Sequence, residues 1–229
     1  MNIDIVHGPG NSAAKVMLSP GESCTAESGA MIAMSGDMQI ETSTHKKQGG
    51  GGGILKAAKR LLSGESIFRN HFTAGPNGGE VFLAATLAGD MMQYNLSGET
   101  LIVQAGSYVC CDSSIDMDMG WQGFKSFFSG ESVFWLKLSG TGPLVINAFG
   151  AIYAIEVNGE YIVDTGHIVA FNESLDFDVT KAGGSWMSTI LGGEGLVCRF
   201  KGTGTVWCQS HNSGSFGATL GPMLKAREG

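Results

Sequence analysis

The chain contains the same sequence pattern three times, and this repetition constrains its fold more than any other feature. SGES begins at Ser63 and again at Ser129, and a related GGEG begins at Gly192. A second motif, a Gly-Glu pair followed seven or eight residues later by another glycine, begins at Gly21, Gly98 and Gly159. Repeats of this kind mark supersecondary units that pack against one another. We therefore divide the chain into a first, a second and a third segment: 2–88, 89–150 and 151–212.

Within each segment, apolar and polar residues alternate. The stretches IDMDM from Ile115 and LDFDV from Leu175 are the clearest examples, and a period of two is typical of strands with one buried face. Gly-Glu, Asn-Gly, Gly-Thr-Gly and Gly-Pro sequences separate these stretches, which predicts hairpin turns. Only the stretch 54–62 has apolar residues at helical spacing. The pattern therefore predicts an all-β fold with a short helical turn in the first segment.

A β unit of this size is marginally stable by itself, because one apolar face of a small sheet stays uncovered. Three units can close around a shared pseudo-threefold axis, bury these faces and remove unpaired strand edges. We therefore expect residues 1–212 to form a single compact body. The remainder, 213–229, is a Gly/Ser-rich tail that we expect to dock through three apolar residues: Phe216, Leu220 and Leu224.

The charge balance argues against nucleic-acid binding as the main function. The formal net charge is −7 with 14 Lys and Arg residues, whereas a phosphate backbone is bound mainly by basic side chains. One local exception, 45–60, contains five basic residues and no acid: Lys46, Lys47, Lys56, Lys59 and Arg60. This stretch is either a solvated loop or a contact for an anionic partner. RNA and an anionic membrane surface are therefore the alternative partners that this stretch predicts.

The five cysteines do not form the framework of a secreted, disulfide-rich protein, because their number is odd and no CxxC spacing occurs. Cys198 and Cys208 flank a Gly-Thr-Gly sequence, so a hairpin there would place them opposite each other; reduced buried thiols are the other reading. The opening residues, MNIDIVHGPG, lack the features of a signal peptide. The longest apolar stretch, 139–155, is interrupted by Gly and Pro. We therefore expect a cytoplasmic protein without a membrane-spanning helix.

A further pattern, GG…K…SGES, combines Gly52 and Gly53 with Lys59 or Lys125 and then SGES at 63–66 or 129–132. In this pattern, and in its triplication over residues 2–222, the chain resembles the altered-inheritance-of-mitochondria family. The resemblance implies three TRAP-like units in one chain, TRAP being the tryptophan RNA-binding attenuation protein, whose subunit is a short double-stranded β-helix. The bacterial members of that family have no settled activity, so the resemblance implies no substrate.

No motif in the sequence combines the residues that a catalytic or metal site needs. The glycine tract 49–53 lacks the Lys-Ser/Thr ending of a phosphate loop, and the five histidines fall at unmatched places in the repeat. Ser66 and Ser132 lie in GES rather than in a nucleophile elbow. The glutamates of the repeated Gly-Glu and related motifs are predicted to accept backbone N–H bonds; they are Glu22, Glu65, Glu99, Glu131, Glu160 and Glu194. We predict no catalytic residue, metal or cofactor.

The densest group of aromatic residues lies between 121 and 135. Packing in the core or between segments would explain this group, whereas exposure of part of it would indicate a contact with a partner. The candidates for such a contact are Trp121, Phe124, Phe127 and Phe128. Together these features predict a non-enzymatic β-scaffold that self-associates, forming a homo-oligomer, and binds a protein partner rather than a small molecule.

Overall fold

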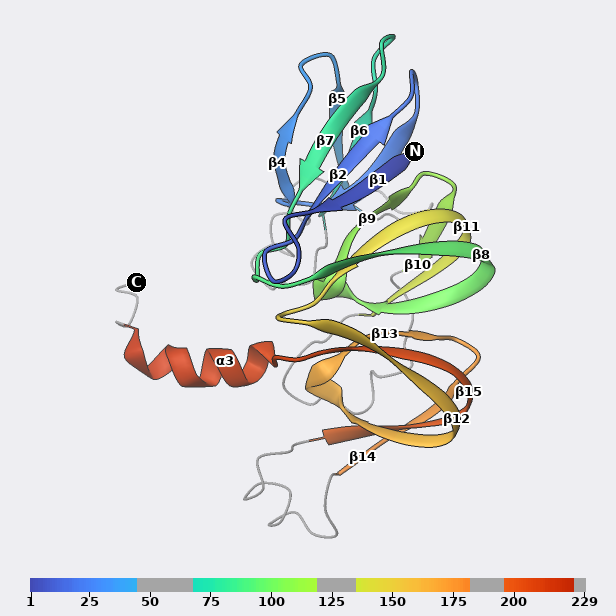
Figure 1. Cartoon of the computed structure of the whole chain (residues 1–229), viewed down its shortest axis with the longest axis vertical. Helices are drawn as coiled ribbons and strands as arrows, with labels where there is room; N and C mark the ends of the chain where they lie inside the picture. Colours follow the sequence, from blue (N-terminus) through green and yellow to red (C-terminus); the bar gives the residue numbers. More distant parts are fainter. Residues whose placement is uncertain (45–67, 119–134, 182–195, 225–229) are drawn as a thin grey trace, which may run out of the picture.

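The computed structural model describes residues 1–44, 68–118, 135–181 and 196–224, and in these ranges the chain is predominantly β (Figure 1). The strands of the first segment are β1 (Asn2–Val6), β2 (Ala13–Leu18), β3 (Ser23–Glu27), β4 (Met31–Met34), β5 (Gln39–Thr44), β6 (Phe68–Thr73) and β7 (Gly79–Leu83). Those of the second segment are β8 (Met91–Gln104), β9 (Tyr108–Asp112), β10 (Ile115–Asp118) and β11 (Trp135–Asn147). Those of the third segment are β12 (Ile152–Asp164), β13 (Ile168–Asn172), β14 (Asp176–Lys181) and β15 (Leu196–Gln209).

The strands form two sheets in which all neighbouring strands pair antiparallel. The smaller sheet has the order β1-β2-β7-β4 and belongs to the first segment. The larger sheet has the order β12-β15-β13-β8-β11-β9-β3-β6-β5, with β10 on β11 and β14 on β15. Figure 1 shows the three segments stacked along the long axis of the molecule, the first in blue and teal, the second in green and yellow, and the third in orange and red.

Several glycines that predict hairpin turns lie instead inside long, bent strands. Gly98 and Gly159 have φ of 102° and 112° and sit within β8 and β12, and Gly202 has a φ of 110° within β15. Glycine adopts this positive φ without steric cost. In the β12–β15 pair Gly159 lies directly opposite Gly202, so both strands bend together and stay paired. The predicted turns at these positions in the second and third segments are therefore wrong.

One irregularity occurs at the same place in each segment. β4 pairs with β7, β9 with β11 and β13 with β15, and each pairing contains a shift of register. The residue left out of register is Ile32 in β4, Val109 in β9 and Val169 in β13. A β-bulge inserts one extra residue and re-aims its side chain. Ile32, Val109 and Val169 are therefore structurally equivalent.

The apolar core consists of three clusters, and neighbouring segments share them. The cluster of the first segment also contains Val109 of the second segment. The cluster of the second segment also contains Val169 of the third, and the cluster of the third segment contains Ile102 of the second. None of these three side chains is exposed. The apolar interior therefore continues across both junctions between segments.

The strand pairing joins neighbouring segments but does not close. β3 pairs with β9 between the first and second segments, and β8 pairs with β13 between the second and third. Among the described strands none joins the third segment to the first, and Figure 1 shows these two at opposite ends of the stack. The predicted pseudo-threefold arrangement is therefore not confirmed. The predicted removal of strand edges is not found in the described ranges either, where β4 pairs with β7 alone and β12 with β15 alone.

The tail contains a helix that the sequence did not predict, α3 (Ser213–Leu220), followed by a 3₁₀ turn (Gly221–Met223). The side-chain oxygen of Asn212 accepts two backbone N–H groups of the first turn, which is the usual function of an N-cap asparagine. Phe216 contacts Phe149 with ring centroids 5.3 Å apart. Leu220 and Leu224 are exposed, and Figure 1 shows α3 projecting away from the strands. Of the three residues expected to dock the tail, Phe216 does so, while Leu220 and Leu224 face solvent.

Candidate functional site

The residues predicted to contact partners lie outside the described part of the chain. These are the basic residues Lys46, Lys47, Lys56, Lys59 and Arg60 and the aromatic residues Trp121, Phe124, Phe127 and Phe128. The predicted helical turn at 54–62 lies outside it as well. The candidate sites among the described residues lie on the strands and at their ends.

The glutamates of the repeated motif act on the backbone at two described positions. A side-chain oxygen of Glu22 accepts a hydrogen bond of 2.7 Å from the backbone nitrogen of Ser19, and Glu99 accepts one of 2.9 Å from that of Ser97. This confirms the predicted structural role of both carboxylates. Glu160 instead forms an ion pair with an arginine of β15. The remaining members of the set lie outside the described residues: Glu65, Glu131 and Glu194.

The five cysteines are buried and free. Cys198 and Cys208 lie on the same strand, β15, so they do not face each other across a hairpin as one interpretation of the sequence expected. Burial raises the pKa of Cys24, Cys198 and Cys208 to about 12. A thiol acts as a nucleophile or metal ligand only as the thiolate, so these side chains function as apolar packing groups.

Neither a metal cluster nor a membrane span is found in the described ranges. Within them, no group of three or more His, Cys, Asp or Glu side chains could hold a metal ion. No helix among the described residues is long and apolar enough to cross a membrane. Two other features remain as candidates, a polar pocket and a pair of exposed strand edges.

A pocket of about 370 Å³ lies where strand ends from all three segments converge. Its wall includes Glu27 at the end of β3, Gln104 at the end of β8, Asn147 at the end of β11 and Gln209 at the end of β15. The carboxamide of Gln209 is held by the backbone nitrogen of Phe149 at 2.9 Å and by the carbonyl oxygen of an adjacent 3₁₀ turn at 3.0 Å. The Gln209 amide in the pocket wall is therefore fixed in orientation.

Glu27 is the one titratable side chain among the described residues that line this pocket. Burial raises the pKa of its carboxyl group to about 7, so the group exists in both protonation states near neutral pH. Acid–base catalysis needs two titratable groups with different environments and roles, and the described lining of the pocket supplies no second titratable group. The pocket can exchange hydrogen bonds with a small polar group. Nothing in the sequence marks Glu27, because its burial results from strand ends far apart in the chain.

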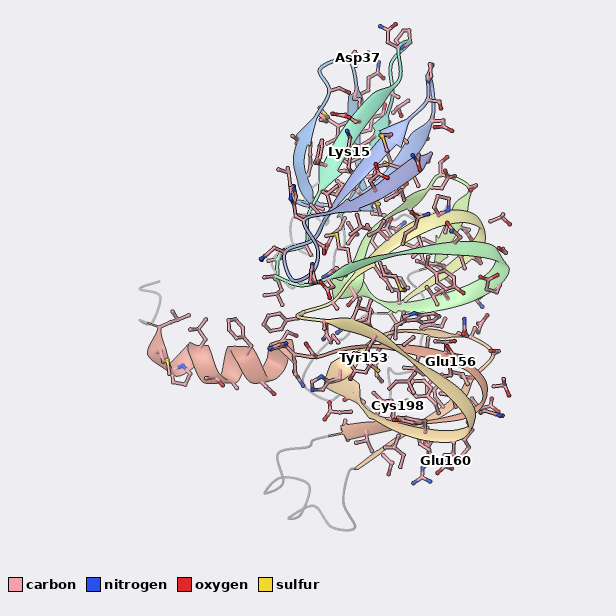
Figure 2. All side chains as sticks on the ribbon, in the orientation of Figure 1. Lys15, Asp37, Tyr153, Glu156, Glu160 and Cys198 are labelled. Carbon is pink, nitrogen blue, oxygen red and sulfur yellow. The ribbon has the colours of Figure 1, made fainter. Side chains whose placement is uncertain are left out.

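Large exposed apolar side chains gather on two of the strands that have a single pairing partner in the described ranges, β4 and β12. On β4, Met31 is 40% and Ile32 59% exposed; on β12, Tyr161 is 46% and Ile162 49% exposed. Figure 2 shows Asp37, which follows β4, and Glu160, which lies in β12, at opposite ends of the molecule. These edges could not be predicted from the sequence, since alternation of apolar and polar residues does not reveal which edge of a strand is paired.

Comparisons with known proteins agree with this fold. The chain is 29% identical over 210 residues to an uncharacterized protein of Streptococcus pyogenes serotype M6, covering 90% of this chain and 84% of that protein. A crystal structure of a Streptococcus pyogenes protein superposes with a TM-score of 0.77 at 27% identity, covering 97% of this chain and 99% of that one. The family model described as Mitochondrial biogenesis AIM24 matches residues 3–211. The chain therefore belongs to the Mitochondrial biogenesis AIM24 family.

Proposed function

We propose that this protein is a non-enzymatic β-scaffold that self-associates and holds a protein partner. The observation that carries the proposal is the position of its exposed apolar side chains. Apart from Ile40 on β5, those of the described residues lie on β4, on β12 and on the C-terminal helix with the turn that follows it: Met31, Ile32, Tyr153, Tyr161, Ile162, Phe216, Leu220, Met223 and Leu224. Contiguous exposed apolar residues usually mark surfaces that another macromolecule covers.

The C-terminal helix supplies the surface for a partner. Phe216 and Leu220 are 47% and 39% exposed on α3, and Met223 is 75% exposed in the following 3₁₀ turn. Figure 1 shows this element extending from the third segment away from the β body. A short helix that presents apolar side chains can lie in an apolar groove of a second protein. The helix then adds a binding function to the β body.

The architecture that we propose is three TRAP-like units in succession, supported by the bulge that recurs at Ile32, Val109 and Val169. The non-enzymatic part of the proposal rests on the pocket at Glu27, where one titratable group has no acid–base partner among the described lining residues. The free, buried cysteines fit a reducing compartment such as the cytoplasm. Binding of RNA or of an anionic membrane depends on the basic stretch 45–60, outside the described residues, and no described contact favours it.

Light scattering tests the self-association. The monomer mass is 23.9 kDa, and we expect the measured mass to exceed it and to rise with concentration across the micromolar range. Because buried apolar surface drives the association, added salt should change this mass little. A mass that stays at the monomer value up to high micromolar concentration would show that the protein does not self-associate.

A further inference from the structure

The two junctions inside the chain use one and the same register. At the first junction β3 pairs with β9 through Cys24–Asp112, Thr25–Cys111 and Ala26–Cys110. At the second, β8 pairs with β13 through Leu101–Asn172, Ile102–Phe171 and Val103–Ala170. Counted from the bulge residues Val109 and Val169, the paired positions are identical. A single mode of strand pairing therefore joins each segment to the next.

Each junction also buries the bulge residue of the following segment. Val109 of the second segment lies in the core cluster of the first, and Val169 of the third lies in the core cluster of the second. Neither side chain is exposed, whereas the equivalent Ile32 of the first segment is 59% exposed. Ile32 has no preceding segment in its own chain to receive it. It is an apolar side chain with the right position for a junction and no core to enter.

The third segment lacks the complementary partner. Leu101 and Ile102, whose backbone in β8 pairs with β13 of the following segment, are fully buried. The residues at the same distance before the next 3₁₀ turn are Tyr161 and Ile162 of β12, which are about half exposed. One end of the chain therefore has an unpaired β4 edge with an exposed bulge residue, and the other end has an unpaired β12 edge of the kind that pairs with such a strand at the internal junctions. Figure 1 shows these ends too far apart in the stack to meet within one molecule.

We infer that the edge of β12 in one molecule pairs with the edge of β4 in a second copy, in the register of the two internal junctions. The pairs are Tyr161–Ser35, Ile162–Met34 and Val163–Ala33, and Ile32 of the second copy enters the core cluster of the third segment. This inference rests on the proposed self-association and specifies its interface. The contact joins two different surfaces, so it repeats from copy to copy and builds a ring or a filament.

Two variants separate this interface from other modes of association. Ile162→Lys leaves the β4 edge intact, and Ile32→Lys leaves the β12 edge intact. Because both side chains are exposed in the single chain, both variants should fold like the wild type by circular dichroism. We expect each variant alone to be monomeric by light scattering. An equimolar mixture should form a 1:1 dimer that grows no further, because one intact edge of each kind remains. Leu220→Lys on α3 is the control and should assemble like the wild type.

Disulfide trapping tests the register. Ile162→Cys mixed with Met34→Cys should cross-link under mild oxidation with copper phenanthroline, since directly opposed residues bring their Cβ atoms within reach of a disulfide. Ile162→Cys mixed with Ala33→Cys should cross-link much more slowly, because a shift of one residue places the side chain on the other face. The native cysteines are buried and should give a low background.

The outcomes distinguish the interface from the proposed function. If the two lysine variants assemble like the wild type, or if their mixture stays monomeric, the β12–β4 interface is wrong while self-association by another surface stands. If the wild type itself is monomeric, both the interface and the self-association are wrong. Equal cross-linking of the two cysteine pairs would refute the register alone.

Discussion

Ile102 and Ile162 offer a matched pair of substitutions with predicted costs that differ severalfold. They occupy equivalent positions in β8 and β12, but Ile102 is fully buried at a junction and Ile162 is 49% exposed at an open edge. Replacement by alanine removes three methyl or methylene groups, each of which stabilises the fold by about 0.8 kcal/mol when buried. At Ile102 the replacement also leaves a cavity. We therefore expect Ile102→Ala to lower the free energy of unfolding by about 3 kcal/mol. Ile162→Ala should lower it by less than about 1 kcal/mol in the monomer.

Urea denaturation followed by circular dichroism measures both values at a protein concentration low enough to keep the chain monomeric. Both variants make the same change from Ile to Ala, and the effect of such a change in a strand depends mainly on the packing and burial of the side chain, so the difference between the two free energies reports how far each side chain is covered. At a concentration where the protein self-associates, the cost of Ile162→Ala should increase while that of Ile102→Ala stays constant. Equal costs for the two variants in the monomer would refute the assignment of Ile162 to an uncovered edge.

Two further predictions concern the pocket and a close backbone approach. Burial raises the pKa of Glu27 from 4.5 to about 7, so between these pH values the folded chain binds a proton that the unfolded chain has released, and the protein loses stability as the pH rises through this range. Glu27→Gln should abolish this dependence of stability on pH and raise the free energy of unfolding at alkaline pH by an amount on the order of 1–3 kcal/mol, measured from urea midpoints. An unchanged pH dependence in the variant would contradict this prediction. At Gly89 a Cβ would lie 1.9 Å from the carbonyl oxygen of Ala148, whereas nothing lies within 4 Å at Gly36. Gly89→Ala should therefore cost more than about 3 kcal/mol in a thermal melt and Gly36→Ala less than about 1, and similar melting temperatures for the two would contradict this.

The β content of the fold could be predicted because it depends on local pattern. IDMD from Ile115 forms β10, in which Ile115 and Met117 are buried and the two aspartates are exposed. DFDVTK from Asp176 forms β14. In both, the alternation of side chains specifies which face of the strand is covered. A prediction of this kind needs no knowledge of which other strand supplies the cover.

The local sequence pattern could not distinguish hairpin turns from bends within a continuous strand. A glycine with positive φ suits a hairpin turn and a sharp bend within a strand equally well. At Gly98 the strand continues because its partner, β11, bends with it through a bulge between Ser139 and Thr141. In the first segment the equivalent position follows Pro20, and the chain divides there into β2 and β3. Proline cannot donate a hydrogen bond to its partner strand. Whether the strand divides, as after Pro20, or continues, as at Gly98, therefore depends on this one residue and on the partner strand.

The helix α3 was missed because its composition opposes it. Glycine and serine are poor helix formers, with glycine costing about 1 kcal/mol relative to alanine. Two glycines and two serines lie within Ser213–Leu220. The N-cap at Asn212 and the contact of Phe216 with Phe149 stabilise the helix, but the second of these depends on residues far apart in the chain. Burial of Glu27 has the same origin, which explains why the pocket was not predicted.

The composition of the open edges gives an independent reason to expect that they are covered. Exposed edge strands of soluble proteins are usually protected from unwanted pairing by lysine, proline or inward-pointing charge. The unpaired stretch of β12 contains Tyr161 and Ile162, and that of β4 contains Met31 and Ile32, which are apolar residues that give no such protection. A chain that keeps such residues on these two edges, in the register of its own internal junctions, would aggregate unless the edges met a specific partner. The complementary edge of a second copy meets this requirement with surfaces that the chain already contains.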